Sequence, residues 1–180
     1  MTPQSSEFVI DGQPCHIDIG GMYNIYNALA AFAVGRTFDV SPEQISQAFA
    51  YDEKVFGRQE VIQLGAKKLT LILVKNPVGL NQVLSMIQTA KQPFGFAMLL
   101  NANYADGIDT SWIWDGNFEE FVASKKAADY LVGGERYQDI ALRLKVAGVP
   151  ETKLTIKPDL GDVLTTLQEM PQQQLYVLAT

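Results

Sequence analysis

The sequence contains very few residues of the kinds that form covalent cross-links or metal sites. Cys15 is the only cysteine and His16 the only histidine in 180 residues. A single cysteine excludes an internal disulfide framework and a zinc site built from several cysteines. Because the two residues are neighbours in a predicted strand, their side chains are expected on opposite faces, which disfavours a thiolate–imidazole catalytic pair. We therefore expect no metal site and no catalytic triad formed within this chain.

Positive charge, long apolar runs and glycine-rich phosphate loops are also scarce. The net charge is −6 and the isoelectric point about 4.7, whereas general binders of nucleic acids or anionic membranes need a basic face. No apolar run reaches the roughly 18 residues of a transmembrane helix, and the N-terminus lacks a secretory signal pattern. No GxxxxGK[ST] stretch occurs, so a complete ATP site is not expected. The sequence is typical of a cytoplasmic protein that binds no nucleic acid.

Local patterns predict a hairpin and two helices in residues 1–52. Two short apolar runs flank the Asp-Gly pair at 11–12, which is a strong hairpin signal. An alanine-rich segment with apolar residues at helical spacing predicts a helix over about 22–36. Ser41 followed by a proline is a clear helix start. About fifty residues do not make a convincing domain alone, so we expect this part to be a remnant of a larger one.

After residue 58, short apolar runs alternate with helical patterns. QEVIQL and KLTLILV read as a hairpin, whereas FGFAMLLNA, ADYLVGG and QLYVLAT read as buried strands. This alternation favours an α/β fold with a mainly parallel sheet and helices on both faces. We place a boundary near residues 52–57 and expect an α/β domain over 53–180. Ligands of such sheets usually bind at the carboxyl ends of the strands.

One loop, NYADGIDTSWIWD, leaves such a strand end and carries three carboxylates and two tryptophans. In one interpretation its aspartates only cap backbone groups in an ordinary connection. In the other, Trp112 and Trp114 brace an interface loop that presents a carboxylate; in an extended SWIWD segment both indoles would share one side. The candidate carboxylates are those of Asp106, Asp109 and Asp115. An aspartate that orients a histidine supplied by another subunit fits this pattern.

Three weaker signals follow, and the first two each have two interpretations. Asn24 and Asn27 share a helix face and either cap the helix or recognise the edge of an adenine. Arg58 either holds a phosphate or forms an interdomain ion pair. Lys75 and Asn76 end a strand and precede a helix, where an anion is favoured.

Four stretches resemble the C-terminal part of the MurT family, the ligase subunit of lipid II isoglutaminyl synthase. They are GGMYNIYNALAAFAV, VFGRQE, LVKNPVGLNQVL and LNANYADGIDTSWIWDGNFEEF, and the resemblance runs from about Ile17 to the end. The family is similar to Mur ligases, with an ATP-binding central domain followed by a Rossmann-like C-terminal domain. The resemblance implies that 1–52 ends the central domain and that 53–180 is the C-terminal domain, lacking its last helix.

The resemblance also implies an activity and a partner. The family forms a heterodimer with GatD, a class I glutamine amidotransferase, and works at the inner face of the membrane in peptidoglycan biosynthesis. Together the two subunits amidate the α-carboxyl group of the D-glutamate in the stem peptide of lipid II. Glutamine supplies the ammonia, and ATP with magnesium activates the carboxylate.

Carried over residue by residue, the resemblance assigns Asp109 as the third member of the GatD triad. The family pattern implies a partner-docking loop with Asp106, Trp112, Trp114 and Asp115. It places Asn24, Asn27 and Arg58 near the nucleotide, and Lys75 and Asn76 in the cleft between domains.

The chain also departs from the family. It lacks the phosphate-binding loop, the magnesium ligands and the four-cysteine zinc ribbon of the central domain, so the isolated chain is expected to be inactive. It has Asn101-Ala102-Asn103 where the family commonly has an acidic residue in the middle. Two alternatives stay open: a non-catalytic interaction module that only scaffolds a partner, and a Mur-type ligase that acts without a glutaminase.

Overall fold

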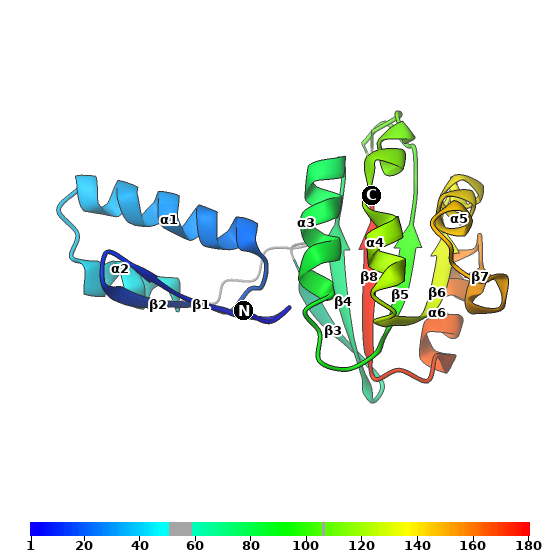
Figure 1. The fold of residues 1–180 in the computed structure, drawn as a ribbon, viewed down its shortest axis with the longest axis horizontal. Coiled ribbons are helices and arrows are strands. Elements are labelled where there is room, and N and C mark those ends of the chain that lie inside the picture. Colours follow the sequence, from blue (N-terminus) through cyan, green and yellow to red (C-terminus); the bar gives the residue numbers. More distant parts are fainter. Residues whose placement is uncertain (51–58, 106) are drawn as a thin grey trace.

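The computed structural model describes residues 1–50, 59–105 and 107–180. The N-terminal part, residues 1–50, is an antiparallel hairpin followed by helices, blue to cyan in Figure 1. Its elements are β1 (Ser6–Ile10), β2 (Gln13–Ile17), α1 (Met22–Thr37) and α2 (Pro42–Phe49). The predicted hairpin and both predicted helices are confirmed. The boundary predicted near residues 52–57 lies outside the described residues.

The tight turn and the second helix start follow from local chemistry. Asp11 and Gly12 have φ values of 49° and 78°, the pair of positive values that a two-residue hairpin turn with the correct twist requires. The Ser41 hydroxyl accepts a hydrogen bond from the Gln44 N–H at 3.2 Å, and the Gln44 side chain accepts one from the Ser41 N–H at 3.1 Å. This reciprocal capping box, with a proline at the next position, begins α2 at the residue predicted.

In the described residues from 59 onward, six strands form one sheet in the order β3-β4-β8-β5-β6-β7. The strands are β3 (Glu60–Leu64), β4 (Lys67–Leu73), β5 (Phe94–Leu99), β6 (Ala127–Gly133), β7 (Leu154–Ile156) and β8 (Gln174–Ala179). β3 and β4 pair antiparallel, and the other neighbours pair parallel. The predicted mainly parallel sheet is therefore confirmed.

Helices cover both faces of this sheet, as predicted (Figure 1). They are α3 (Pro77–Ile87), α4 (Phe118–Ala123) and α5 (Tyr137–Val146) on one face and α6 (Leu160–Glu169) on the other. Because α6 returns from β7 to β8, against the direction of the other crossovers, a right-handed connection puts it on the opposite face. None of the helices placed by the structure combines the length and apolar character that a membrane crossing needs.

A cluster of aromatic side chains fills the space between the sheet and α4. Phe121 is 0% exposed, and its ring centroid lies 4.9 Å from that of Phe96, 6.2 Å from Phe94 and 6.4 Å from Tyr130. Tyr176 packs edge-on against Phe94 at 4.9 Å. Burial raises the pKa of Tyr130 to about 12, so its phenol stays neutral. The cluster fixes α4 against β5, β6 and β8.

Polar side chains connect the N-terminal part to the sheet. Gln59 accepts a hydrogen bond from the Gly20 N–H at 3.2 Å and donates to the Gly20 carbonyl at 2.9 Å. It also donates to the Tyr23 hydroxyl at 3.0 Å. Gln4 donates to the Tyr176 hydroxyl at 3.3 Å. The two parts are therefore in direct contact through side chains from both.

Candidate functional site

The loop that leaves β5 lies at the carboxyl edge of the sheet, at the upper end in Figure 1. Within it, Ser111–Asp115 forms a short 3₁₀ helix, η1, and not an extended segment. Ile113 is 1% exposed, and its N–H donates to the Thr110 carbonyl at 3.2 Å. The interpretation that both tryptophans lie on one side of an extended segment is wrong, because a 3₁₀ helix has three residues per turn.

The turn gives the two indoles different surroundings. Trp112 is half-buried and packs against the main hydrophobic core. Trp114 is 47% exposed, and the guanidinium carbon of Arg143 lies 5.4 Å from its ring centroid. The neighbouring Asp115 is exposed, and its carbonyl accepts a hydrogen bond from the Asn81 side chain at 3.2 Å. Trp112 serves packing, whereas Trp114 offers apolar surface to solvent.

Asp109 stands exposed at the start of this turn. Its Oδ1 accepts a hydrogen bond from the Ser111 N–H at 2.8 Å. Hydrogen bonding by Ser111, first through its hydroxyl and then through its N–H, lowers the pKa of Asp109. The carboxylate is therefore ionised at neutral pH, held by its own turn and open to solvent.

A depression of about 350 Å³ opens beside Asp109. The start of α5 forms part of its lining, where Arg136 and Asp139 form an ion pair. These two residues were not predicted from the sequence, although an arginine and an aspartate three apart at a helix start are an available signal. The other lining residues are Ile108, Thr110, Ser111, Ile113 and Trp114. Charges of both signs therefore face the space beside Asp109.

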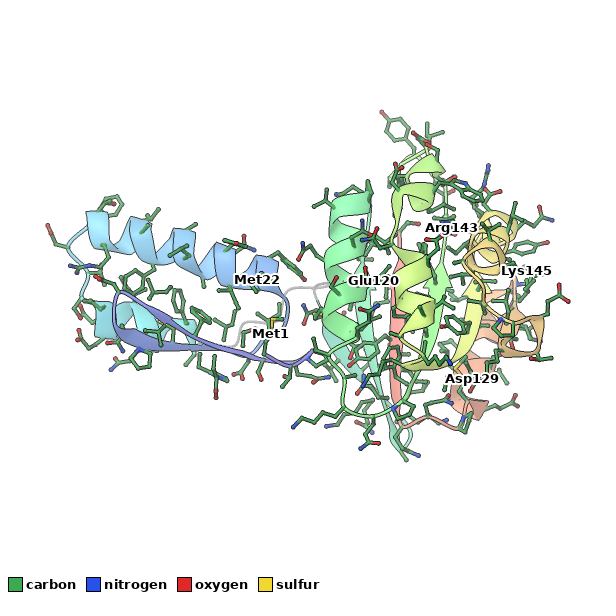
Figure 2. The ribbon with its side chains drawn as sticks, viewed as in Figure 1. Met1, Met22, Glu120, Asp129, Arg143 and Lys145 are labelled. Carbon is green, nitrogen blue, oxygen red and sulfur yellow. The ribbon has the colours of Figure 1, made fainter. Side chains whose placement is uncertain are left out.

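Arg143, on α5, is a buried residue that was not predicted from the sequence. It is 2% exposed and lies between α5 and α4 (Figure 2). Its guanidinium forms a salt bridge with Glu119 at 2.7 Å. A sequence signal was present: Ile140 and Leu144 are buried, and an arginine three residues after Ile140 must share their face.

Lys75 and Asn76 lie just beyond β4, and both side chains bind backbone groups. The Lys75 Nζ donates to the Ala105 carbonyl at 2.9 Å, which ties β4 to the loop after β5. Asn76 is the N-cap of α3, and its Oδ1 accepts a hydrogen bond from the Gly79 N–H at 2.8 Å. Both residues brace local structure here, and their role in lining an interdomain cleft stays a prediction.

Replacing Asn76 with alanine is expected to lower the free energy of unfolding by about 1 kcal/mol, because α3 loses its cap. Urea unfolding of the wild type and the variant measures this difference. Asn76→Asp is the matched control, since a carboxylate keeps the acceptor and suits the helix dipole, so wild-type stability is expected. Equal stability of the alanine variant would contradict the capping role.

Asn24 and Asn27 lie on α1, in the N-terminal part and not at the sheet edge that carries the loop (Figure 1). The Asn24 Nδ2 donates to the Gly20 carbonyl at 2.6 Å, whereas an N-cap side chain accepts from a backbone N–H. No side-chain hydrogen bond caps α1, so the capping interpretation is wrong for Asn24. Asn27 is exposed. Arg58 and Asp106 lie outside the described residues. Nucleotide binding by Asn24, Asn27 and Arg58 therefore stays a prediction.

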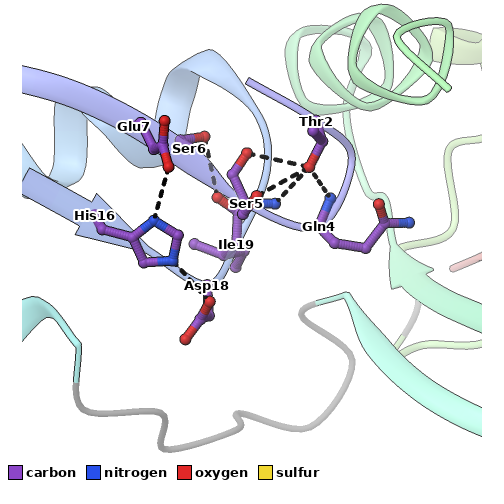
Figure 3. A network of polar contacts seen from close by, with 8 residues as sticks. All are labelled: Thr2, Gln4, Ser5, Ser6, Glu7, His16, Asp18 and Ile19. Atoms are coloured by element: carbon purple, nitrogen blue, oxygen red, sulfur yellow. Dashed lines mark hydrogen bonds and ion pairs between the residues drawn. The ribbon is translucent and has the colours of Figure 1, made fainter. Parts of the chain in front are cut away.

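The cysteine and the histidine occupy opposite faces of β2, as predicted. Cys15 is 4% exposed. Figure 3 shows His16 between Asp18, whose Oδ1 lies 2.9 Å from Nε2, and Glu7, whose Oε1 lies 4.0 Å from Nδ1. Across residues 1–50, 59–105 and 107–180, no three side chains of His, Cys, Asp or Glu are grouped as metal ligands. His16 therefore belongs to a surface polar network of the hairpin.

The chain matches known sequences over its whole length. The family described as MurT ligase C-terminal matches residues 73–180. The MurT subunit of lipid II isoglutaminyl synthase (glutamine-hydrolyzing) from Streptococcus pneumoniae is 48% identical over 180 residues, which is 100% of this chain and 40% of that protein. The same subunit from Staphylococcus aureus is 33% identical over 151 residues, which is 84% of this chain and 34% of that protein.

A solved structure shares the fold. The crystal structure of MurF from Acinetobacter baumannii superposes with a TM-score of 0.69 over 99% of this chain and 40% of that chain, at 23% identity. This likeness confirms the predicted Mur ligase-like architecture, including the hairpin and helices that precede the sheet. The chain spans 40% of the length of its relative from S. pneumoniae. From the family match and this 48% identity, the chain belongs to the MurT family.

Proposed function

We propose that the chain is the C-terminal part of the ligase subunit of lipid II isoglutaminyl synthase. The complete subunit then amidates the α-carboxyl group of the D-glutamate in the stem peptide of lipid II, at the inner face of the membrane. ATP activates that carboxylate, and a partner glutaminase, GatD, releases the ammonia from glutamine. The 48% identity to the S. pneumoniae subunit over the whole chain supports this proposal.

The proposed contribution of this chain to the chemistry is the carboxylate of Asp109. The observation that carries it is an exposed, ionised carboxylate held at 2.8 Å by the Ser111 N–H at the carboxyl edge of the sheet. An aspartate that accepts a hydrogen bond from the Nδ1–H of a histidine fixes the tautomer whose Nε2 takes the proton from the nucleophile. Asp109 would supply this group in trans to the Cys–His pair of the glutaminase.

The ATP-dependent step is assigned to the rest of the subunit. The chain has no GxxxxGK[ST] loop. Among the described residues, the Asn24 side chain is engaged by Gly20 and the Lys75 ammonium by Ala105. These side chains therefore do not form a phosphate cradle.

The surface around Asp109 is proposed to dock the glutaminase. It carries large exposed apolar side chains, namely Tyr104, Ile108 and Trp114. Arg136 and Asp139 add charge at the start of α5. Apolar and aromatic groups surrounded by polar side chains are typical of protein interfaces. A glutaminase bound there would meet the carboxylate of Asp109 within the interface.

Trp114→Ala in the complete ligase subunit is expected to weaken glutaminase binding by about tenfold or more, as is typical of a central interface tryptophan. Isothermal titration calorimetry measures the dissociation constant. Leu164→Ala is the matched control, because Leu164 is also 47% exposed but lies on α6, on the other face of the sheet. If Trp114→Ala binds the glutaminase as tightly as the wild type, docking at this surface is wrong.

A further inference from the structure

Arg143 reaches from α5 to the end of the turn that follows Asp109. Its Nε donates to the Ile113 carbonyl at 3.2 Å, and its Nη2 donates to the Gly116 carbonyl at 2.7 Å. Basic side chains stabilise the carbonyl end of a helical turn in this way. The guanidinium therefore caps the C-terminal end of η1, whereas Asp109 lies at its N-terminal end.

Glu119, on α4, holds the guanidinium from the other side. Nη1 donates to Oε1 at 2.7 Å and Nη2 donates to Oε2 at 2.8 Å, which is a two-point fork. These hydrogen bonds from Arg143 lower the pKa of Glu119. The rings of Trp114 and Phe118 lie 5.4 and 5.2 Å from the guanidinium carbon. Carbonyls, carboxylate and rings together fix one orientation of the side chain.

Stability alone is a weak reason for this arrangement. Burying a guanidinium carries a large desolvation penalty. The partner carboxylate of Glu119 is 61% exposed, so the ion pair offsets only a small part of this penalty. A planar fork bonded at several points instead defines geometry, because it fits only one relative placement of its acceptors. The acceptors here are the end of η1 and the start of α4.

The same turn connects this fork to the carboxylate of Asp109. Ile113, whose carbonyl binds Arg143, donates its own N–H to the Thr110 carbonyl at 3.2 Å. Inside that turn, the Ser111 N–H holds the Asp109 Oδ1 at 2.8 Å. A rotation of the turn would therefore carry both the Ser111 N–H and the carboxylate away from their present positions.

We propose that Arg143 is a positioning residue for Asp109. The fork between Arg143 and Glu119 fixes the orientation of η1, and η1 in turn fixes the position of the Asp109 carboxylate. This inference rests on the proposed function, in which Asp109 orients the glutaminase histidine. A displacement of about one ångström at such a group costs on the order of a hundredfold in rate. Arg143 therefore acts on glutamine hydrolysis without touching the glutaminase histidine.

The test uses Arg143→Met and Arg143→Lys in the complete ligase–glutaminase complex. Methionine fills the buried space but donates no hydrogen bond. For this variant kcat for glutamine hydrolysis, measured with the ligase subunit at saturation, is expected to fall about 10- to 100-fold with KM within about twofold of the wild type. The dissociation constant of the complex is expected to rise as well, because the same turn carries Trp114. Lysine keeps the charge without the fork, so it is expected to recover part of kcat.

Lys145→Met is the matched control. Lys145 is also a basic residue of α5 and pairs with Glu151 at 2.7 Å, but both side chains are exposed. Figure 2 labels it beside Arg143. Wild-type kcat is expected for this variant, because an exposed ion pair away from the turn does not set the carboxylate. Amide hydrogen exchange at Ser111 is expected to accelerate in Arg143→Met and not in Lys145→Met.

The inference is wrong if the assembled Arg143→Met complex has wild-type kcat. It is equally wrong if the variant binds the glutaminase more weakly but hydrolyses glutamine at the wild-type rate once bound. If Arg143→Met does not assemble with the glutaminase, kcat is measured for Glu119→Gln instead. The Glu119 side chain is 61% exposed, so this replacement weakens the fork without disturbing the apolar core. A lower kcat at unchanged affinity then supports the inference, and wild-type kcat refutes it. Asp109→Asn is measured in parallel: full activity there refutes the proposed function itself.

Discussion

Asp109→Asn in the assembled ligase–glutaminase complex is expected to lower kcat for glutamine hydrolysis by on the order of 10³–10⁴-fold. Asparagine keeps the acceptor for the Ser111 N–H, so the turn is expected to stay in place. It removes the negative charge and favours the wrong tautomer of the histidine that it faces. A coupled assay of glutamate release measures the effect, and calorimetry is expected to show unchanged assembly.

Asp162→Asn is the matched control, because Asp162 is an exposed carboxylate of α6, on the other face of the sheet. Wild-type hydrolysis is expected for it. Full glutaminase activity in Asp109→Asn would instead favour the alternative function, a non-catalytic module that only scaffolds its partner. The two hypotheses share the docking loop and differ in this one carboxylate.

Phe121→Ala is expected to lower the free energy of unfolding by about 3–5 kcal/mol, the range typical of a fully buried phenylalanine. Phe121 is 0% exposed and packs against Phe96, Phe94 and Tyr130. Its loss leaves a cavity between α4 and the strands that rigid neighbours fill only partly. Urea unfolding followed by circular dichroism measures the change.

The control for this substitution is Phe38→Ala, since Phe38 is 76% exposed after α1. A change within about 0.5 kcal/mol is expected there, as for surface positions in general. A loss for Phe121→Ala as small as that of the control would mean that the aromatic cluster is not the core that fixes α4.

Elements decided by short-range chemistry could be predicted from the sequence. The Asp11-Gly12 pair suits a turn with two positive φ values, and Ser41 with Gln44 makes a reciprocal cap. The apolar runs predicted a mainly parallel sheet. The order of its strands was not predicted, because periodicity reports which face of a strand is buried and not which strand lies beside it.

The SWIWD segment shows where local pattern gives the wrong structure. Its alternation reads as extended, but burial of Ile113 and the hydrogen bonds from Arg143 hold it as a 3₁₀ turn. Those contacts come from α5, far along the chain, where no short window includes them. Asp109 was identified through a family motif, whereas its hydrogen bond from Ser111 and the contacts of Arg143 depend on tertiary packing that the sequence pattern does not report.

The central place of β8 has a consequence for the order of folding. Among the strands that the structure describes, β8 comes latest in the sequence, yet it lies between β4 and β5. During synthesis the facing edges of these two strands therefore wait unpaired until residues 174–179 emerge from the ribosome, and such long-range parallel pairing is slow. Exposed strand edges in a nascent chain invite aggregation. Because β8 pairs with β4 on one side and β5 on the other, its insertion joins β3–β4 to β5–β6–β7 in one sheet.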